Sequence, residues 1–232
     1  MPAAEFDSFA SSYEADLDQA LSVSGESKDF FAEGRVRWLA HRLHSLRFRA
    51  ASVLDYGCGI GGTAVLLREV LGATSVTGLD VSARSLEVAR SRYATPAIQF
   101  LTFDQYACAG EIDLAYCNGV FHHIAVTERD QAIQYIHRVL RPGGLFALWE
   151  NNPWNPGTRY VMSKCAFDAT AVTLSPPETA QLLRRNGFQV VRTDFRFFFP
   201  KALRWFRSLE PQLASLPLGA QYLVLGRKPS GD

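Results

Sequence analysis

The feature that most constrains the fold is a regular alternation, between Val53 and Ala147, of short apolar runs with helical patterns. Such an alternation is typical of βαβ units, which place their strands side by side in a mainly parallel sheet. Five strands are expected at residues 51–55, 75–80, 97–103, 112–117 and 145–149, and two closing strands at 188–198 and 220–226. The pattern therefore predicts an α/β fold with a doubly wound, mainly parallel, seven-stranded sheet.

Capping residues place the helices between these strands. Ser82 is a good N-cap, Gly72 suits the left-handed end of a helix, and Ser175 followed by Glu178 forms a capping box. Residues 5–46 have helical character without strand patterns, and we expect them to form a lid over the sheet. The whole chain, 1–232, is predicted to be a single domain.

Composition limits the partners and the location. Lys plus Arg number 24 and Asp plus Glu 23, giving a net charge of +1, so no overall field gathers nucleic acid. No apolar run reaches about 18 residues, and the N-terminal residues lack the pattern of a secretion signal, so we expect a cytoplasmic protein without stable membrane insertion. The four scattered cysteines show no paired spacing typical of a zinc knuckle or a disulfide framework.

A glycine-rich turn follows the first expected strand. Gly57, Gly59 and Gly62 spell G-x-G-x-x-G, and Asp80 lies at the spacing of an acid that accepts ribose hydroxyls, so a nicotinamide cofactor is one interpretation. However, Asp55 would set a negative charge beside the pyrophosphate of such a cofactor. A cationic ligand suits this carboxylate better.

The same segment, residues 53–61, resembles the first motif of class I S-adenosylmethionine-dependent methyltransferases. Four further segments resemble later motifs of that family, in the same order: residues 78–82, 103–104, 118–123 and 141–144. The resemblance covers roughly residues 50 to 150. It implies a Rossmann-like methyltransferase fold with S-adenosylmethionine as cofactor, bound mainly by a core of residues 49–150. Residues 1–48 would then be the lid, and residues 151–232 would carry acceptor-side elements and the closing strands.

The resemblance also implies roles for single residues. The glycine loop would lie against the methionine part of the cofactor, Asp80 would take the ribose hydroxyls, and Asp104 would read the adenine amino group. Arg35 could hold the cofactor carboxylate, although a solvated helix face explains this arginine equally well. The implied cofactor-binding residues are Arg35, Asp55, Gly57, Cys58, Gly59, Asp80, Val81, Asp104, Gln105 and Asn118.

On the acceptor side, His122 and His123 are the imidazoles nearest the expected cofactor edge. We expect His123, with an ordinary pKa near 6.5, to act as a general base for a hydroxyl or amine acceptor, unless both histidines only pack the turn. No metal is expected, because related metal-using enzymes carry acids beside the histidine. The candidate acceptor contacts are Tyr13, Trp154, Arg159 and Tyr160.

The sequence thus predicts an enzyme that methylates a small molecule on oxygen or nitrogen. A catalytically silent partner subunit that binds S-adenosylmethionine, or a nicotinamide-dependent oxidoreductase, is the alternative. Residues 201–216 place leucines and Phe206 on one helical face and basic residues on another. Ordinary core packing is the first interpretation of this segment, and a lipid-like acceptor, a membrane surface or a dimer interface are the others.

Overall fold

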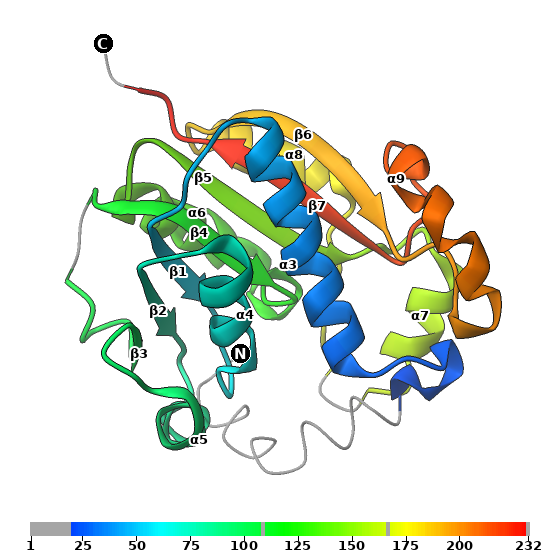
Figure 1. Cartoon of the computed structure of the whole chain (residues 1–232). Coiled ribbons are helices and arrows are strands. Elements are labelled where there is room, and N and C mark those ends of the chain that lie inside the picture. Colours follow the sequence, from blue (N-terminus) through cyan, green and yellow to red (C-terminus); the bar gives the residue numbers. More distant parts are fainter. Residues whose placement is uncertain (1–19, 108–109, 166–167, 231–232) are drawn as a thin grey trace.

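The computed structural model of the chain describes residues 20–107, 110–165 and 168–230. Their strands form one seven-stranded sheet in the order β3-β2-β1-β4-β5-β7-β6, in which only β7 runs antiparallel to its neighbours (Figure 1). The strands are β1 (Ser52–Tyr56), β2 (Ser75–Leu79), β3 (Ile98–Leu101), β4 (Ile112–Asn118), β5 (Leu140–Asn151), β6 (Gln189–Arg196) and β7 (Gln221–Arg227). The predicted mainly parallel, seven-stranded α/β fold is confirmed.

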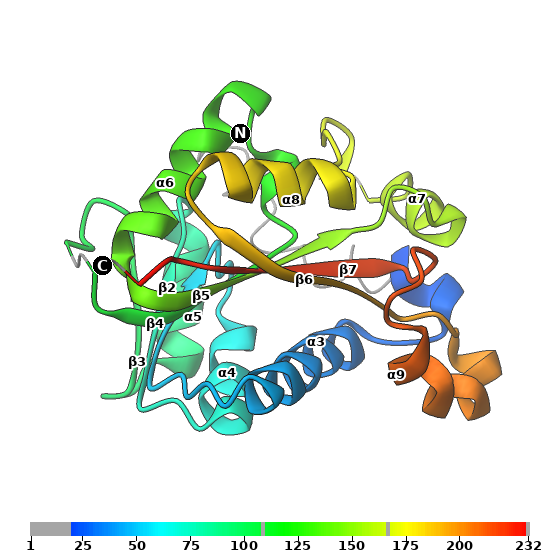
Figure 2. The same cartoon turned by 90° about the horizontal axis from the view of Figure 1, so that it is seen from above.

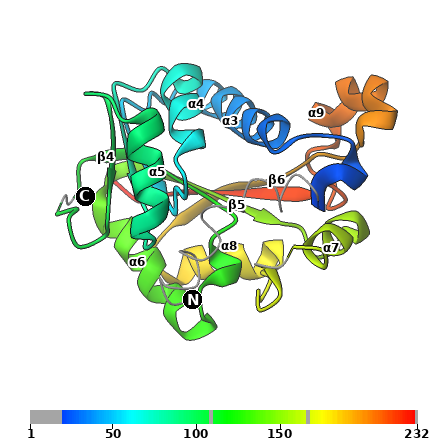
Figure 3. The same cartoon turned by 90° about the horizontal axis from the view of Figure 1, so that it is seen from below.

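Helices cover both faces of the sheet (Figure 2). One face carries α3 (Lys28–Ser45), α4 (Gly62–Leu71) and α5 (Ala83–Tyr93), and the other carries α6 (Arg129–Val139) and α8 (Pro176–Arg185). Two short helices, α7 (Pro156–Met162) and α9 (Glu210–Leu213), lie at the same end of the sheet (Figure 3). Short 3-10 turns complete the described chain: η1 (Ser22–Ser24), η2 (Phe121–His123), η3 (Val126–Glu128) and η5 (Lys201–Leu209).

The capping signals of the sequence act where they were expected. The Ser82 hydroxyl accepts a hydrogen bond of 3.0 Å from the Ser85 amide and begins α5. Gly72 ends α4 with a φ of +66°, which a glycine adopts without steric cost. Ser175 and Glu178 form the capping box of α8. Local sequence therefore fixes the helix ends, because each cap satisfies backbone groups that the helix itself leaves unbonded.

Helix α3 is part of the core rather than a lid. Val36 and Leu39 on this helix are fully buried against the sheet. The buried Trp38 donates an indole hydrogen bond of 3.0 Å to Asp194 of β6. The expected lid over residues 1–48 is therefore not found for residues 28–45, because the buried side chains of this helix pack on the sheet. Residues 1–19 lie outside the described part of the chain.

The segment that follows β6 corrects a second expectation. None of the residues of η5 is buried, and Trp205 is 66% exposed. Core packing is therefore the wrong interpretation of residues 201–209, because their apolar side chains face solvent. Within the described residues, no helix has the length and apolar character that crossing a bilayer requires.

Candidate functional site

A cavity of about 1310 Å³ opens where β1, β2 and β4 end. In open α/β sheets, ligands bind beyond the carboxyl ends of the strands, near the point where the strand order reverses. Here that point lies between β1 and β4. The wall includes all the predicted cofactor residues of the turn and strand ends, namely Asp55, Gly57, Cys58, Gly59, Asp80, Val81 and Asn118, together with Arg35 from α3.

The glycine turn has a conformation that requires glycine at two of its positions. Gly57 and Gly59 have φ values of +73° and +53°, in the left-handed region that other residues rarely adopt. A Cβ atom on Gly57 would stand 2.4 Å from a methyl carbon of Val120. The amides of Gly57 and Cys58 both donate to the Leu79 carbonyl, at 2.8 and 3.0 Å, which ties the turn to the end of β2. The backbone of the turn therefore forms part of the cavity floor.

Asp80 connects the turn to the start of α5. Its two carboxylate oxygens accept hydrogen bonds from the backbone amides of Gly59, at 2.8 Å, and of Ser82, at 2.9 Å. The carboxylate is 9% exposed and faces the cavity beside the more exposed Val81. A carboxylate fixed in this way can accept hydrogen bonds from a diol on its remaining lone pairs.

Asp55 is a buried acid at the end of β1. Burial, reinforced by the nearby charge of Asp80, raises the pKa of Asp55 from its ordinary value near 4 to about 7, although Arg35 works in the opposite direction. The Oδ2 atom of Asp55 is buried without a hydrogen-bond partner in the described chain, and so is the Oδ1 atom of Asn118. Buried polar atoms of this kind need a partner. The ammonium, sulfonium and hydroxyl groups of S-adenosylmethionine supply cations and donors, so these residues fit that cofactor.

Arg35 is buried between two other cavity residues. Its guanidinium donates to the Tyr116 hydroxyl at 3.3 Å and to the Gln221 side-chain oxygen at 2.9 Å. Since Arg35 is 7% exposed and lines the cavity, the solvated-face interpretation of this arginine is wrong. Its charge can offset a carboxylate of a bound ligand.

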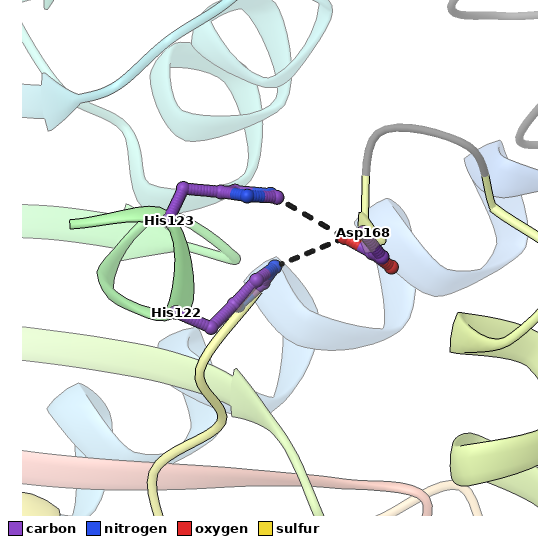
Figure 4. A group of neighbouring side chains, drawn as sticks. All are labelled: His122, His123 and Asp168. Atoms are coloured by element: carbon purple, nitrogen blue, oxygen red, sulfur yellow. Dashed lines mark ion pairs between the residues drawn. The ribbon is translucent and has the colours of Figure 1, made fainter. Parts of the chain in front are cut away.

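His122, His123 and Asp168 meet on another part of the cavity wall (Figure 4), and Glu150, which does not line the cavity, contacts His122. His122 Nδ1 lies 2.6 Å from a Glu150 carboxylate oxygen, and the Nε2 atoms of His122 and His123 both lie 3.4 Å from Asp168 Oδ1. The other Glu150 oxygen accepts a hydrogen bond of 2.8 Å from the Phe121 amide. The histidine turn is thereby held by the end of β5.

The histidines differ in their electrostatic settings. The carboxylates of Glu150 and Asp168 outweigh burial and raise the pKa of His122 to about 10. For His123, burial and the neighbouring His122 lower the pKa to about 4. The expectation of an ordinary pKa near 6.5 at His123 is therefore wrong, because the side chain is removed from water beside a second imidazole. Glu150 and Asp168 were missed at the sequence level. An acid at the end of a buried strand is a usable signal for Glu150, whereas no local pattern connects Asp168 with the histidines.

The structure places several predicted ligand contacts away from the cavity wall. Asp104 and Gln105 are exposed and do not line it, although Phe103 does. Residues 156–162 form α7 rather than a loop. Trp154, Arg159 and Tyr160 point to solvent, while Thr158, Val161 and Met162 line the cavity. Tyr13 lies outside the described residues. The proposed roles of these residues remain predictions.

An aromatic wall faces the cavity from α3 and from the segment after β6. The Phe197 ring lies 4.9 Å from the Phe31 ring and 6.0 Å from the Phe30 ring, measured between centroids. The Arg207 guanidinium stacks 4.4 Å above the Phe30 ring and also borders the cavity. This wall joins segments far apart in the sequence, so the sequence pattern did not reveal it.

Comparisons with known proteins agree with this geometry. A family model described as a methyltransferase domain matches residues 53–144. An uncharacterized methyltransferase of Synechocystis is 35% identical over 60% of this chain and 68% of its own length. An O-methyltransferase of Aspergillus sclerotiorum is 29% identical over 75% of this chain and 67% of its own. The matches to two further curated methyltransferases span only 36% and 38% of their lengths.

Among solved structures, a chain from the complex of the Haloferax volcanii Trm112 methyltransferase activator with a methyltransferase superposes with a TM-score of 0.65. The superposition covers 97% of this chain and 98% of that one at 21% identity, which establishes a shared fold.

Three features define an α/β protein that can bind S-adenosylmethionine. They are the glycine turn, Asp80 after β2, and the buried polar atoms of Asp55 and Asn118, which suit a cationic ligand. The chain belongs to the class I S-adenosylmethionine-dependent methyltransferases, and S-adenosylmethionine is its cofactor. These comparisons support neither the nicotinamide-dependent oxidoreductase nor the silent partner subunit.

Proposed function

We propose that the protein transfers the methyl group of S-adenosylmethionine to an oxygen or nitrogen atom of a small molecule bound in the same cavity. The observation that carries this proposal is the continuity of the cavity, which runs from the glycine turn to the aromatic wall. Its volume of about 1310 Å³ exceeds the range of about 300–1,000 Å³ common for a single ligand. An acceptor can therefore lie beside the cofactor.

The lining favours an acceptor with an apolar or aromatic part. Phe30, Phe31 and Phe197 present ring faces and edges, and aromatic pairs at such spacings gain energy beyond the area that they bury. Arg207 at the same wall is paired with Glu26 at 2.9 Å, so this ion pair gives the wall a polar edge beside the aromatic rings. The cofactor supplies a methyl group on a positively charged sulfur. The chain's task is then to hold the acceptor atom in line with that group.

The direct test uses the intact chain, S-adenosylmethionine labelled in its methyl group and a fractionated extract of small metabolites. We expect the label to appear in one or a few low-molecular-weight products, each with one methyl group in place of a hydrogen that leaves as a proton. The matched control is Gly57→Ala, which places a Cβ against Val120 in the glycine turn and should remove the transfer. Label that appears only in macromolecules, or equally with the control variant, would contradict the proposal.

A further inference from the structure

The group formed by His122, His123 and Asp168 has a geometry suited to a metal ion. The three ligand atoms, two imidazole Nε2 atoms and one carboxylate oxygen, all lie within 4.8 Å of one another. Both imidazole nitrogens are 3.4 Å from Asp168 Oδ1. A tetrahedral zinc ion bound at about 2.1 Å from each ligand separates its ligand atoms by about 3.4 Å. The observed spacing thus matches two edges of such a site.

The surroundings of His122 resemble the second layer of known metal sites. A histidine that binds a metal through Nε2 usually donates its other ring N–H to a carboxylate, which fixes the tautomer and the direction of the ring. Glu150 lies 2.6 Å from His122 Nδ1 and is itself held by the Phe121 amide. This arrangement points the Nε2 atom of His122 toward Asp168, so a metal ion bound there would replace the proton on this nitrogen.

The charges around the group also suit a divalent cation. The side chains of Glu150 and Asp168 are 1% and 5% exposed, and they bring two carboxylates to one small region. The buried guanidinium of Arg129 donates to the backbone oxygens of Ile124 and Val172. Asp168 Oδ1 forms ion pairs of 3.4 Å with the two imidazole Nε2 atoms and no closer hydrogen bond among the described residues. A divalent ion would bond this oxygen and balance both carboxylates.

We propose that His122, His123 and Asp168 bind one divalent transition-metal ion of the zinc type, with an open coordination position toward the cavity. Three protein ligands and one open position are typical of catalytic rather than structural zinc sites. All three residues line the cavity that contains the cofactor residues. An acceptor oxygen in the open position would be polarised by the ion, a use that rests on the proposed function. The binding of the ion does not depend on it.

The alternative to a metal ion at this group is a proton. A second proton on His122 would hold this ring between Glu150 and Asp168 without a metal. The two occupants give different results in a titration of chelator-treated, full-length protein with Co²⁺, which reports its coordination by visible absorption. We expect one Co²⁺ per chain, with the absorption of a four- or five-coordinate ion, and its displacement by one equivalent of Zn²⁺.

Four variants test whether the ion lies at this group. Asp168→Asn and His123→Gln should each remove the equimolar binding, and Glu150→Gln should weaken it by about 10- to 100-fold. His44→Gln, which removes an exposed imidazole on α3, is the matched control and should bind as the wild type does. Circular dichroism and calorimetry with S-adenosylmethionine check that each variant is folded.

Absence of equimolar Co²⁺ binding by the wild-type chain would overturn the proposal, and so would equal binding by folded Asp168→Asn or His123→Gln protein. If one of these two variants does not fold, the other and the wild type decide the question. A chain that binds Co²⁺ at this site but transfers no methyl group to any small molecule would contradict the proposed function alone.

Discussion

At the scale of single residues, the site depends on two carboxylates, Asp55 and Asp80, whose positions and burial are determined by the glycine turn around them. Asp80 is held by two backbone amides, and Asp55 is buried close to it with one oxygen lacking a partner. The sequence predicted both positions, because motif spacing reports which residues end a strand. The raised pKa of Asp55 and the lowered pKa of His123 could not be predicted from the sequence, because each depends on neighbouring residues from other elements.

Replacing Asp80 tests the predicted ribose contact. We expect Asp80→Ala to weaken S-adenosylmethionine binding by about 1.5–3 kcal/mol, or roughly 10- to 150-fold, the scale of hydrogen bonds to a charged group. Isothermal titration calorimetry measures this, with Glu87→Ala on the exposed side of α5 as the control. Equal affinities for the two variants would show that the carboxylate serves only the turn.

The raised pKa of Asp55 predicts a dependence of cofactor affinity on pH. A bound cation favours the ionised carboxylate, so binding lowers the pKa of Asp55 and releases a proton. Affinity should therefore be greatest above the free-state pKa of about 7 and decrease as the pH falls through it. Between pH 8 and pH 6 we expect a loss of about tenfold.

Asp55→Asn is the control for this measurement. Its affinity should vary with pH only as far as the ionisation of the cofactor itself requires, so the comparison isolates the carboxylate. A wild-type chain with the same pH profile as Asp55→Asn would show that the carboxylate is ionised throughout this range.

At the scale of secondary-structure elements, α7 shows that helix formation determines which side chains of a polar segment line the cavity. Residues 150–160 are rich in proline and asparagine, as loops often are, and Trp154, Arg159 and Tyr160 were expected to contact the acceptor. Asn155 instead accepts a hydrogen bond of 2.9 Å from the Thr158 amide and caps a helix. Helical spacing then turns Arg159 and Tyr160 to solvent and Thr158, Val161 and Met162 to the cavity.

Substitutions on the two sides of α7 therefore have different expected results. Val161→Trp fills part of the cavity and should raise the KM for the acceptor about tenfold or more, because the larger side chain occupies space that the ligand would use. Tyr160→Trp, on the solvent side, should leave it unchanged. Calorimetry should give wild-type cofactor affinity for both. A rise in KM for Arg159→Ala without one for Val161→Trp would restore the contact inferred from sequence.

The boundaries of β5 show where local signals mislead. Pro142, Gly143 and Gly144 are residues typical of a turn, and the expected strand began only at Leu145. The strand begins at Leu140, because Gly143 adopts a φ of +74° and its amide donates to the Lys228 carbonyl. These residues therefore lie within β5 as a local irregularity, at the point where the register between β5 and β4 shifts.

At the scale of the whole molecule, one buried acid, Asp194, joins helix α3 to β6, an edge strand of the sheet. Asp194 on β6 is fully buried and accepts hydrogen bonds from Trp38 and Arg42 of α3 and from Arg192. The sequence predicted both the helix and the strand but not their contact, since no periodicity encodes a pairing over such a separation.

Removal of Asp194 should cost more stability than removal of an exposed acid. Asp194→Ala leaves the Trp38 and Arg42 donors partly buried without this acceptor, and we expect a loss of about 3 kcal/mol in the free energy of unfolding. Asp130→Ala is the control, because Asp130 pairs with Arg185 on the surface and should contribute less than about 1 kcal/mol. Urea unfolding followed by circular dichroism measures both. Similar losses for the two variants would show that the buried contact does not hold the layers together.

The distance along the chain between Trp38 and Asp194, 156 residues, sets an order of events during synthesis. At roughly 5–20 residues per second, the ribosome delivers Asp194 about 8–30 s after Trp38. During that interval α3 cannot pack against β6, because β6 has not been synthesised. Gln221, which accepts a hydrogen bond from Arg35, is synthesised after β6. The cofactor wall that α3 supplies can therefore be completed only after Gln221 has emerged, so a nascent chain should begin to bind S-adenosylmethionine after that point rather than when its glycine turn first appears.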